Sequence, residues 1–316
     1  MNNISKTLIR KIGHNIKNNI VSEEELNTFN EYRNTYIEVM EELLAYIKDK
    51  LPKPLFIARR LKRLESIKIK LQRFPQMELD RMQDIGGTRA VFNNLDEVKE
   101  YIKNIRVIEN STFKIIKEND YISNPKDDGY RSYHIVFECL SDKLKGYKVE
   151  LQIRDLKEHY WATAVEILSV ISKSNNLKIG KGEEYYKRFF YLSSKILHNE
   201  YDKNEVDELK ELDKKYKILD TLKGFSLGFS YIDDLKIQDL FYIIYIKYNA
   251  KEVYVRSFNK KNVEEASSLY KDLEKEDNIN AVLVDARDIK TLNEAYPNYF
   301  GDSKKFINYI ERMINE

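Results

Sequence analysis

Carboxylates, cations, an aromatic ring and a histidine lie close together in two stretches of this 316-residue chain. The first stretch is RMQDIGGTR, in which Asp84 precedes two glycines. The second runs from Lys126 to Arg154 and begins KDDGYRSYH, so Tyr130 and His134 follow a polar turn. These groups offer oxygens for a metal ion, donors for phosphates and a flat ring for a base. The residue types therefore indicate a nucleotide site rather than core packing.

The segment YKVELQIR alternates strictly between apolar and polar residues. The apolar residues from Val149 to Ile153 are interleaved with Glu150, Gln152 and Arg154, a period of two that predicts a strand with one buried face. An exposed edge strand explains such a pattern by itself. If Glu150 lies near Asp84, however, the two carboxylates suit a Mg²⁺ ion that keeps several waters and bridges phosphate oxygens.

The segment FIARRLK places Arg60 and Lys62 two residues apart, on one face of a predicted strand. The apolar residues of Leu55–Leu61 take the other face. A helix expected to start near Ser66 presents Lys70 toward the same region. The alternative interpretation is a cationic strand edge that resists aggregation.

The loop before the second predicted strand is rich in turn formers, and we expect it to expose the ring of Tyr130 for stacking against a base. Lys126 is a candidate phosphate ligand. His134 is a candidate donor to a phosphate or a ribose, although a structural histidine is the commoner outcome for a single His. Arg89 enters the predicted strand TRAVF, directly after the glycines that follow Asp84.

Overall charge does not mark the chain as a nucleic-acid binder, because the formal net charge is only +2. Two basic stretches, Met1–Ile20 and Arg59–Arg73, are candidates for phosphate contacts, and solvated faces are the alternative. Cys139 is the only cysteine, which excludes an internal disulfide and a thiolate zinc site. No run approaches the roughly 18 apolar residues that a membrane span needs. We therefore expect a soluble cytoplasmic protein without a membrane partner.

The hydrophobic pattern predicts an α+β fold, a mixed sheet flanked by helices. Helical spacing covers Leu8 to Lys50, with Ser22 or Asn27 as a cap, and returns from Ala164 to Ile171 and from Tyr185 to Leu222. Strands are predicted at 55–62, 88–92, 132–140 and 147–154, with helices at 66–74 and 95–105. A final unit combines the paired strands FYIIYIKY and KEVYVRSF, a helix at 263–273, the strand AVLVDA and a helix at 303–313. We predict four regions: N-terminal helices (1–50), a catalytic core (51–172), a helical connector (173–234) and a C-terminal domain (235–316).

Four motifs together resemble the synthetase domain of RelA/SpoT homologues over roughly residues 50 to 170. They are RLKRLESI from Arg60, DIGGTR from Asp84, PKDDGYRSYH from Pro125 and VELQIR from Val149. The resemblance implies a nucleotidyltransferase-like α+β fold and an ATP-dependent pyrophosphokinase. Such an enzyme moves the β,γ-pyrophosphate of ATP onto a ribose 3′-hydroxyl, and AMP leaves.

The resemblance also implies a role for each motif residue. Asp84 and Glu150 would hold Mg²⁺, and Glu150 is the candidate base. The implied ATP-binding residues are Arg60, Lys62, Ser66, Lys70 and Arg89. The implied acceptor-binding residues are Lys126, Tyr130, His134, Gln152 and Arg154, with Tyr130 stacking on the acceptor base.

Two further segments resemble toxic small alarmone synthetases. DLKEHYWATAVE matches their HxWA…E form, so His159, Trp161 and Glu166 are expected to support the site from a helix, with plain helix packing as the alternative. AYPNYF places Tyr296 and Tyr299 three residues apart, like the YxxY element of CapRel-type toxin-antitoxin fusions. That resemblance implies a C-terminal domain whose tyrosines cover the ATP site until a phage protein binds.

The acceptor stays open between two classes. The toxin resemblance implies transfer to the 3′ CCA end of tRNA, which stops translation in anti-phage defence. The alternative is a (p)ppGpp- or ppApp-type alarmone synthetase that acts on GDP, GTP or an adenosine nucleotide, because stacking tolerates any base. A catalytically dead binding module is disfavoured, because both candidate metal carboxylates are present.

Overall fold

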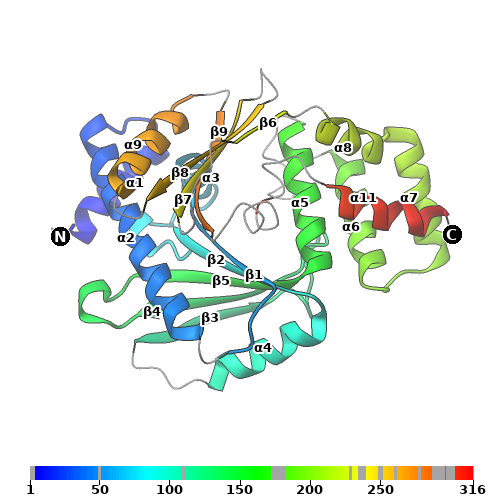
Figure 1. The fold of residues 1–316 in the computed structure, drawn as a ribbon, viewed down its shortest axis with the longest axis horizontal. Coiled ribbons are helices and arrows are strands. Elements are labelled where there is room, and N and C mark those ends of the chain that lie inside the picture. The colour runs from blue at the N-terminus through cyan, green and yellow to red at the C-terminus, as the bar shows by residue number, and fades with distance from the viewer. Residues whose placement is uncertain are drawn as a thin grey trace.

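The computed structural model describes residues 4–48, 51–107, 112–171, 183–227, 230–233, 240–247, 252–259, 262–276, 279–286, 296 and 303–315. In these residues a twisted mixed sheet runs through the molecule, with helices packed against it and a further group of helices at one side (Figure 1). The predicted α+β class, a mixed sheet flanked by helices, is confirmed.

The predicted N-terminal helical region consists of two helices, α1 (Lys6–Lys17) and α2 (Glu23–Lys48). Ser5 caps α1 by accepting a hydrogen bond from the Leu8 amide at 3.2 Å. Ser22 begins α2 with a capping box, in which its hydroxyl accepts from the Glu25 amide and the Glu25 carboxylate accepts from the Ser22 amide. The cap at Ser22 was one of the two that the sequence offered.

The described strands form one sheet in the order β3-β4-β5-β2-β1-β9-β7-β8-β6. Their bounds are β1 Phe56–Leu61, β2 Gly86–Phe92, β3 Phe113–Asp120, β4 Tyr133–Cys139, β5 Lys148–Asp155, β6 Ser230–Asp233, β7 Leu240–Lys247, β8 Glu252–Asn259 and β9 Ile279–Ala286. Strands β2 and β5 are parallel, whereas β1 with β2 and β4 with β5 are antiparallel. The parallel pair brings the start of the DIGGTR motif beside the start of VELQIR.

The strands between 235 and 316 extend the sheet of the predicted catalytic core. Strand β9 pairs antiparallel with β1, with Arg59 opposite Asp285 and Arg60 opposite Val284. Helix α9 (Val263–Glu274) packs against β7, β8 and β9. The region that the sequence assigns to a C-terminal domain is therefore joined to the core by backbone pairing at β1.

Two strands lie outside the predicted ones. Strand β3 forms an edge of the sheet, and its sequence FKIIKEND is mostly polar with no continuous alternation. Strand β6 is only four residues long and lies at the opposite edge. Edge strands bury little side-chain surface, so their hydrophobic pattern is weak and the sequence did not indicate them.

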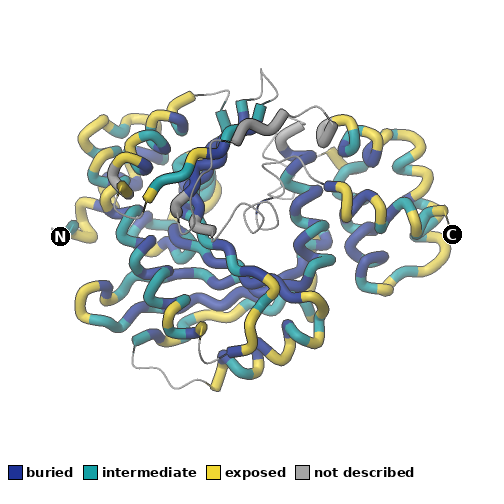
Figure 2. Tube along the Cα trace, viewed as in Figure 1, coloured by how far each residue is buried: buried dark blue, intermediate teal, exposed yellow. Residues whose placement is uncertain are grey.

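Helices α3 (Leu64–Arg73) and α4 (Leu95–Val107) connect β1 to β2 and β2 to β3. The main hydrophobic core lies between one side of the sheet and helices α1, α2, α4 and α9. In Figure 2 the central strands are mostly dark blue, the colour of buried residues, whereas the covering helices are buried only in part. Tyr36 of α2 sits directly over β2, where a Cβ added at Gly86 would lie 3.0 Å from the Tyr36 Cβ. Gly86 thus permits the close approach of helix and strand.

A second core lies among α5 (Leu156–Ile171), α6 (Glu184–Leu197), α7 (Lys203–Tyr216), α8 (Ile218–Leu227) and α11 (Lys304–Asn315). The segment from Tyr185 to Leu222, predicted only as helical, is three helices because Asn199 and Lys217 adopt left-handed backbone angles between them. Helix α11 contacts α5, α6, α7 and α8, so the end of the described chain completes this group (Figure 1). None of the described helices has the length and hydropathy that crossing a membrane requires.

A buried ion pair joins the N-terminal and C-terminal parts of the chain. The Arg33 side chain of α2 is only 1% exposed and donates to the Glu274 carboxylate of α9 at 2.9 and 3.3 Å. Its guanidinium also lies 4.9 Å from the Tyr270 ring centre and 5.2 Å from that of Phe29. Removing one partner leaves the other charge buried and uncompensated.

We expect Arg33→Ala to lower the free energy of unfolding by about 3–5 kcal/mol, the usual cost of breaking a buried ion pair by removing one partner. Urea unfolding followed by circular dichroism measures it. Arg188→Ala is the matched control, because Arg188 pairs with Glu208 and both side chains are more than 40% exposed. A smaller loss for Arg33→Ala than for Arg188→Ala would contradict the structural role of the buried pair.

Candidate nucleotide site

Strand register gathers the predicted site residues on one face of the sheet. Arg60 lies opposite Gly87, which pairs with Glu150, and Arg89 pairs with Gln152, which lies opposite His134. Directly paired residues project to the same side of a sheet. We call this side the polar face. It is made up of Arg60, Arg89, His134, Glu150, Gln152 and Arg154.

Asp84 lies at the edge of the polar face, two residues before β2, and is held by two lysines. Its carboxylate oxygens accept hydrogen bonds from Lys62 Nζ and Lys70 Nζ, each at 2.8 Å. Burial raises the pKa of Asp84, but the charges of the two lysines outweigh burial and lower the pKa to about 2. Asp84 is therefore a permanent anion between two cations. Its hydrogen-bond partners are Lys62 and Lys70.

Helix α3 brings Lys70 to Asp84. The helix starts at Leu64, two residues earlier than the sequence indicated, so Ser66 lies in its first turn. Ser66 and Lys70 are four residues apart and share one side of the helix. The predicted ATP-binding residues Lys62, Ser66 and Lys70 thus come from the residue after β1 and from the first and last turns of α3.

A chain of hydrogen bonds joins Tyr130, His134 and Glu150. The Tyr130 hydroxyl lies 2.8 Å from His134 Nε2, and His134 Nδ1 lies 3.0 Å from Glu150 Oε1. Because a carboxylate can only accept, Nδ1 carries the proton, and in the neutral ring Nε2 accepts from Tyr130. Gln152 Nε2 donates to the other Glu150 oxygen at 2.8 Å.

The surroundings of Glu150 and Tyr130 determine their ionisation states. Burial raises the pKa of Glu150, but the hydrogen bonds that it accepts from His134 and Gln152 lower it, so the pKa lies below its ordinary value. Burial raises the pKa of Tyr130 to about 12, so the phenol stays a donor at neutral pH. Glu150 is therefore an anion and Tyr130 a neutral hydrogen-bond donor.

The ring of Tyr130 is half-buried, whereas the sequence predicted an exposed platform. Lys126 Nζ lies 4.7 Å from the Tyr130 ring centre and 4.4 Å from that of Tyr121. Tyr121 and His134 meet the Tyr130 ring edge-on. Lys126 therefore occupies space beside the Tyr130 ring that a stacking base would compete for.

Helix α6 supports the loop that carries Tyr130. Gly129 has a φ of +88°, and a Cβ there would lie 2.9 Å from the Ser194 Cβ. Ser194 Oγ donates to the Gly129 carbonyl at 2.6 Å. Only glycine can adopt this backbone angle with a helix so close. The contact of Gly129 with α6 therefore sets the position of the Tyr130 backbone.

Arg89 and Arg154 form the most buried cationic part of the polar face. Burial and the charge of Arg89 lower the pKa of Arg154 to about 9, and burial and the charge of Arg60 lower the pKa of Arg89. The Nε atoms of Arg89 and Arg154 are buried without a hydrogen-bond partner. Such donors lack the acceptors that a phosphate supplies.

Helix α5 contributes three residues that the HxWA…E pattern predicted. His159 Nδ1 lies 2.7 Å from an Arg154 Nη, and Trp161 Nε1 donates to the Phe190 carbonyl at 2.8 Å. The Trp161 ring also packs against Tyr130, with ring centres 6.3 Å apart. Glu166 acts electrostatically on Arg89 and Arg154. His159 and Trp161 thus combine helix packing with contacts to site residues.

The sequence did not indicate Tyr121, which contacts Lys126, Tyr130 and His134. Tyr121 follows β3, the edge strand that the hydrophobic pattern did not reveal. In a chain with 23 tyrosines, no local signal distinguishes it from the others. Only the pairing of β3 with β4 brings it to the site.

The donor set of the site suits a hard divalent cation. Asp84 and Glu150 are both ionised, and the charge of Asp84 acts to raise the pKa of Glu150. Carboxylate oxygens of this kind are the ligands that Mg²⁺ uses beside phosphate. The residues present therefore fit the metal that the sequence predicted, although lysines and His134 now occupy the same oxygens.

Tyr296 lies against the part of the polar face that strand β1 contributes. Its side chain is buried at 2% exposure, and its hydroxyl donates to the Arg59 carbonyl at 2.7 Å. It packs with Phe56, Ala58 and Val91, which share the side of the sheet occupied by Arg60 and Arg89. Tyr299, the second tyrosine of the predicted pair, lies outside the described residues.

Residues 59–168 match the family described as "Region found in RelA / SpoT proteins". The chain is 35% identical to GTP pyrophosphokinase YjbM of Bacillus subtilis over 113 residues, which are 34% of this chain and 53% of the relative. It is 28% identical to GTP pyrophosphokinase YwaC of the same bacterium over 160 residues, or 48% of this chain and 63% of the relative. The chain thus spans between half and two thirds of the curated relatives it matches.

Among solved structures, a GTP pyrophosphokinase family protein from Streptococcus pneumoniae is 27% identical and superposes with a TM-score of 0.46. That match covers 61% of this chain and 97% of the other. The matched family region contains Arg60, Asp84, Tyr130 and Glu150, so it coincides with the site described above. The family match and the two curated relatives support the predicted RelA/SpoT-type synthetase region. None of them establishes a toxin-antitoxin fusion.

The lysine partners of Asp84 predict a specific acid dependence of stability. The folded pKa of about 2 lies below the ordinary value of 3.8, so the charge stabilises the fold above pH 3.8 and this contribution is lost toward pH 2. The difference corresponds to about 2 kcal/mol. We expect the wild type to exceed Asp84→Asn in unfolding free energy by an amount that is constant from pH 5 to 6 and shrinks below pH 4. Urea unfolding at each pH measures it, and equal differences at pH 3 and pH 6 would contradict the ion pairs.

Proposed function

We propose that this chain is an ATP-dependent pyrophosphokinase that transfers the β,γ-pyrophosphate of ATP to a ribose 3′-hydroxyl. The single observation that carries the proposal is the polar face, where buried cations surround two ionised carboxylates beside an aromatic loop. In the reaction the 3′-oxygen attacks the β-phosphorus, the bond from the α,β-bridging oxygen to that phosphorus breaks, and AMP leaves. The 3′-hydroxyl proton passes to a base or to water.

The cations meet the main demand of this reaction, which is to hold and neutralise spread negative charge. On the ATP side we place Arg60, Lys62, Ser66, Lys70 and Arg89. Arg89 has a buried Nε without a partner, so a phosphate oxygen would satisfy a donor that the protein leaves open. Phosphate binding there would also relieve the repulsion that lowers the pKa of Arg89 and Arg154.

Asp84 and Glu150 would hold Mg²⁺, which supplies Lewis-acid stabilisation of the phosphate charge when it is bound. The low pKa of both carboxylates suits ligation, because neither must lose a proton first. The same low pKa makes Glu150 a weak base, so its role as a ligand is favoured over its predicted role as the base. Lys62 and Lys70, now bonded to Asp84, become available to phosphates when a metal replaces them.

On the acceptor side we place Lys126, Tyr130, His134, Gln152 and Arg154. An incoming base would displace the Lys126 ammonium from the Tyr130 ring, and the ammonium could then meet acceptor phosphates. The hydrogen bond from Tyr130 to His134 keeps the ring oriented while Lys126 moves. In this proposal the acceptor base takes the place of the Lys126 ammonium beside the Tyr130 ring.

For the acceptor, GDP or GTP is the first candidate. YjbM and YwaC, the curated relatives, are both named GTP pyrophosphokinases. The basic stretches that would grip a tRNA backbone are partly neutralised here: Arg10 pairs with Asp80, Lys11 with Glu25, and Arg59 with Glu41. A guanine nucleotide needs only the polar face and the Tyr130 loop.

Transfer to the tRNA 3′ end by a restrained toxin is the second candidate, and Tyr296 is the observation that favours it. This tyrosine, from the C-terminal region, is buried beside Arg89 and raises the pKa of that arginine electrostatically. A residue in that position would compete with ATP for the β1 end of the polar face. Release by a phage protein that binds the C-terminal region would then expose the site.

Pyrophosphate transfer is tested with ATP labelled at the γ-phosphate, Mg²⁺, and GDP, GTP, ATP or bulk tRNA in separate reactions. We expect the label to appear in a guanine nucleotide with one AMP released for each product. Label in tRNA alone, falling steeply with added salt, would favour the second candidate. No labelled product and no AMP with any acceptor, for the wild type and a Tyr296→Ala variant alike, would contradict the proposed reaction.

We expect Asp84→Ala and Tyr130→Ala each to reduce transfer by at least about 100-fold, because one removes a metal ligand and the other the acceptor platform. Asp96→Ala in the first turn of α4 and Tyr46→Ala in α2 are matched controls that lie outside the polar face. Circular dichroism checks that each variant is folded. Full activity in both site variants would refute the residue assignment.

We expect Tyr296→Ala to raise the basal transfer rate, because it opens the β1 end of the polar face to ATP. Tyr296→Phe, which removes only the hydrogen bond to the Arg59 carbonyl, should raise it less. Tyr101→Ala is the matched control: it removes a tyrosine that is 1% exposed in α4, in the core on the other side of the sheet. An unchanged or lower rate in Tyr296→Ala, with KM for ATP also unchanged, would count against autoinhibition.

A further inference from the structure

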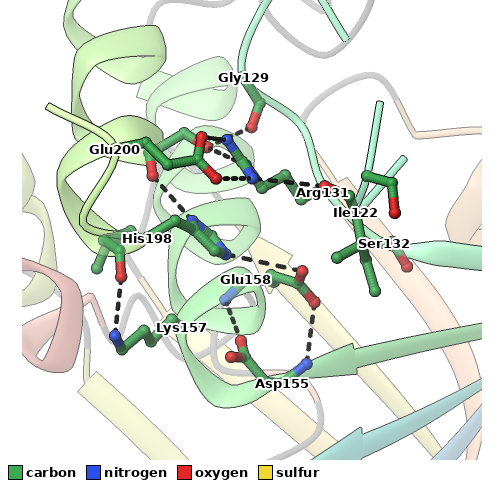
Figure 3. A network of polar contacts seen from close by, with 12 residues as sticks. Ile122, Gly129, Arg131, Ser132, Asp155, Lys157, Glu158, His198 and Glu200 are labelled. Carbon is green, nitrogen blue, oxygen red and sulfur yellow. Dashed lines mark hydrogen bonds and ion pairs between the residues drawn. The ribbon is translucent and has the colours of Figure 1, made fainter. Parts of the chain in front are cut away.

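We propose that Asp155, Glu158 and His198 form a site for one divalent transition-metal ion, separate from the polar face. The three side chains come from the end of β5, the first turn of α5 and the residue after α6. Each offers one ligand atom, and these atoms all lie within 4.8 Å of one another. Figure 3 shows the three side chains converging beneath the ion pair of Arg131 with Glu200.

Two of the ligand atoms are buried and lack a partner in the protein. The Glu158 side chain is fully buried and that of His198 is 8% exposed. Glu158 Oε1 and His198 Nε2 face each other at 3.8 Å, and neither makes a hydrogen bond. Leaving a buried carboxylate oxygen and a ring nitrogen unsatisfied costs stability, so this pair points to a missing ligand.

The other ring nitrogen of His198 makes a hydrogen bond that orients Nε2 toward Glu158. His198 Nδ1 lies 2.9 Å from the Ser194 carbonyl, which can only accept, so Nδ1 carries the proton and the Nε2 lone pair faces Glu158. A metal-binding histidine is commonly held by this arrangement. With the proton on Nδ1, the lone pair of His198 Nε2 is available to bind a metal ion.

Asp155 and Glu158 are fixed in a capping box at the start of α5. The Asp155 carboxylate accepts from the Glu158 amide at 2.9 Å, and Glu158 Oε2 accepts from the Asp155 amide at 3.0 Å. This box uses one oxygen of each carboxylate. It accounts for the position of both residues but not for Glu158 Oε1 or His198 Nε2.

Distances agree with a metal more closely than with a direct ion pair. A dication about 2.1 Å from two ligand atoms permits a separation of up to about 4.2 Å between them, and the 3.8 Å of Glu158 and His198 lies within that limit. The same 3.8 Å is too long for a hydrogen bond. Two carboxylates and a neutral imidazole also balance a charge of +2, with water free to complete the coordination.

The donor set selects the chemical class of ion. Imidazole nitrogen favours Zn²⁺ and its neighbours in the first transition row, whereas Mg²⁺ prefers oxygen ligands and keeps its waters. We therefore assign the site to a transition-metal dication and use Zn²⁺ and Mn²⁺ as probes. Mg²⁺, the ion proposed for Asp84 and Glu150, serves as the comparison.

Such an ion would link the end of α6 to the start of α5 through its ligands. Beside it, Arg131 pairs with Glu200 and contacts Ser194, and Ser194 holds Gly129, the residue before Tyr130 (Figure 3). The metal would therefore stabilise the helix on which the Tyr130 loop rests. It would be a structural ion, and its test needs no enzyme activity.

The site is tested on the full chain in an Asp84→Asn, Glu150→Gln background, which removes the candidate magnesium ligands. The protein is stripped with EDTA and incubated with Zn²⁺, Mn²⁺ or Mg²⁺. Tm is measured with the free ion still present, and metal content is measured after desalting. We expect one Zn²⁺ or Mn²⁺ per chain and a rise in Tm of about 5 °C at 100-fold excess over Kd. Mg²⁺ should give neither.

Asp155→Asn with Glu158→Gln is the decisive variant, because asparagine and glutamine keep the capping box but remove both charges. We expect this variant and His198→Ala to bind the ion at least about 100-fold more weakly and to lose the Tm shift, since each removes direct ligands. His14→Ala, in the exposed part of α1, should bind like its parent. The proposal is overturned if the parent retains no metal and shows no shift, or if the capping-box variant binds as tightly as the parent.

Discussion

The rest of this structure depends on one constraint: several positive charges lie close together on the buried polar face of the sheet. Arg89 and Arg154 are brought together because β2 and β5 pair in parallel, and each has a buried Nε without a partner. Burial lowers the pKa of both arginines, and the charge of Arg60 on Arg89 and of Arg89 on Arg154 lowers it further, so the folded protein bears an electrostatic cost there. An anionic ligand removes this cost, so the face is arranged for phosphate rather than for stability.

The surroundings of the polar face can be understood as responses to that charge. Asp84 is shared by two lysines, Glu150 is held by His134 and Gln152, and Glu166 of α5 lowers the repulsion between the arginines. These contacts keep every charged group partly compensated before any ligand binds. A metal and a nucleotide would exchange the lysine and histidine contacts for their own, so binding would rearrange partners rather than create charge.

Parts of the chain that are distant in sequence pack against the site. Strand β9 extends the sheet beyond β1, Tyr296 packs beside Arg89, and α6 sets the position of Gly129. The Arg33–Glu274 pair ties α9 to α2 on the other side of the sheet. Because the core and the C-terminal region share one sheet, a displacement of β9 would reach β1 and the polar face directly.

The sequence by itself determined the α+β class, the main strands and helices, and the identity of the site motifs. It could do so because alternation in VELQIR, helical spacing and the capping box at Ser22 are local patterns of period two or 3.6. The tertiary structure alone decided which groups are neighbours: Asp84 with Lys62 and Lys70, Lys126 over Tyr130, and Tyr121 beside both. It also decided that β9 joins β1, that β3 forms an edge, and that Glu158 faces His198. These contacts depend on strand register and on helices that meet across long sequence separations, and no local periodicity encodes them.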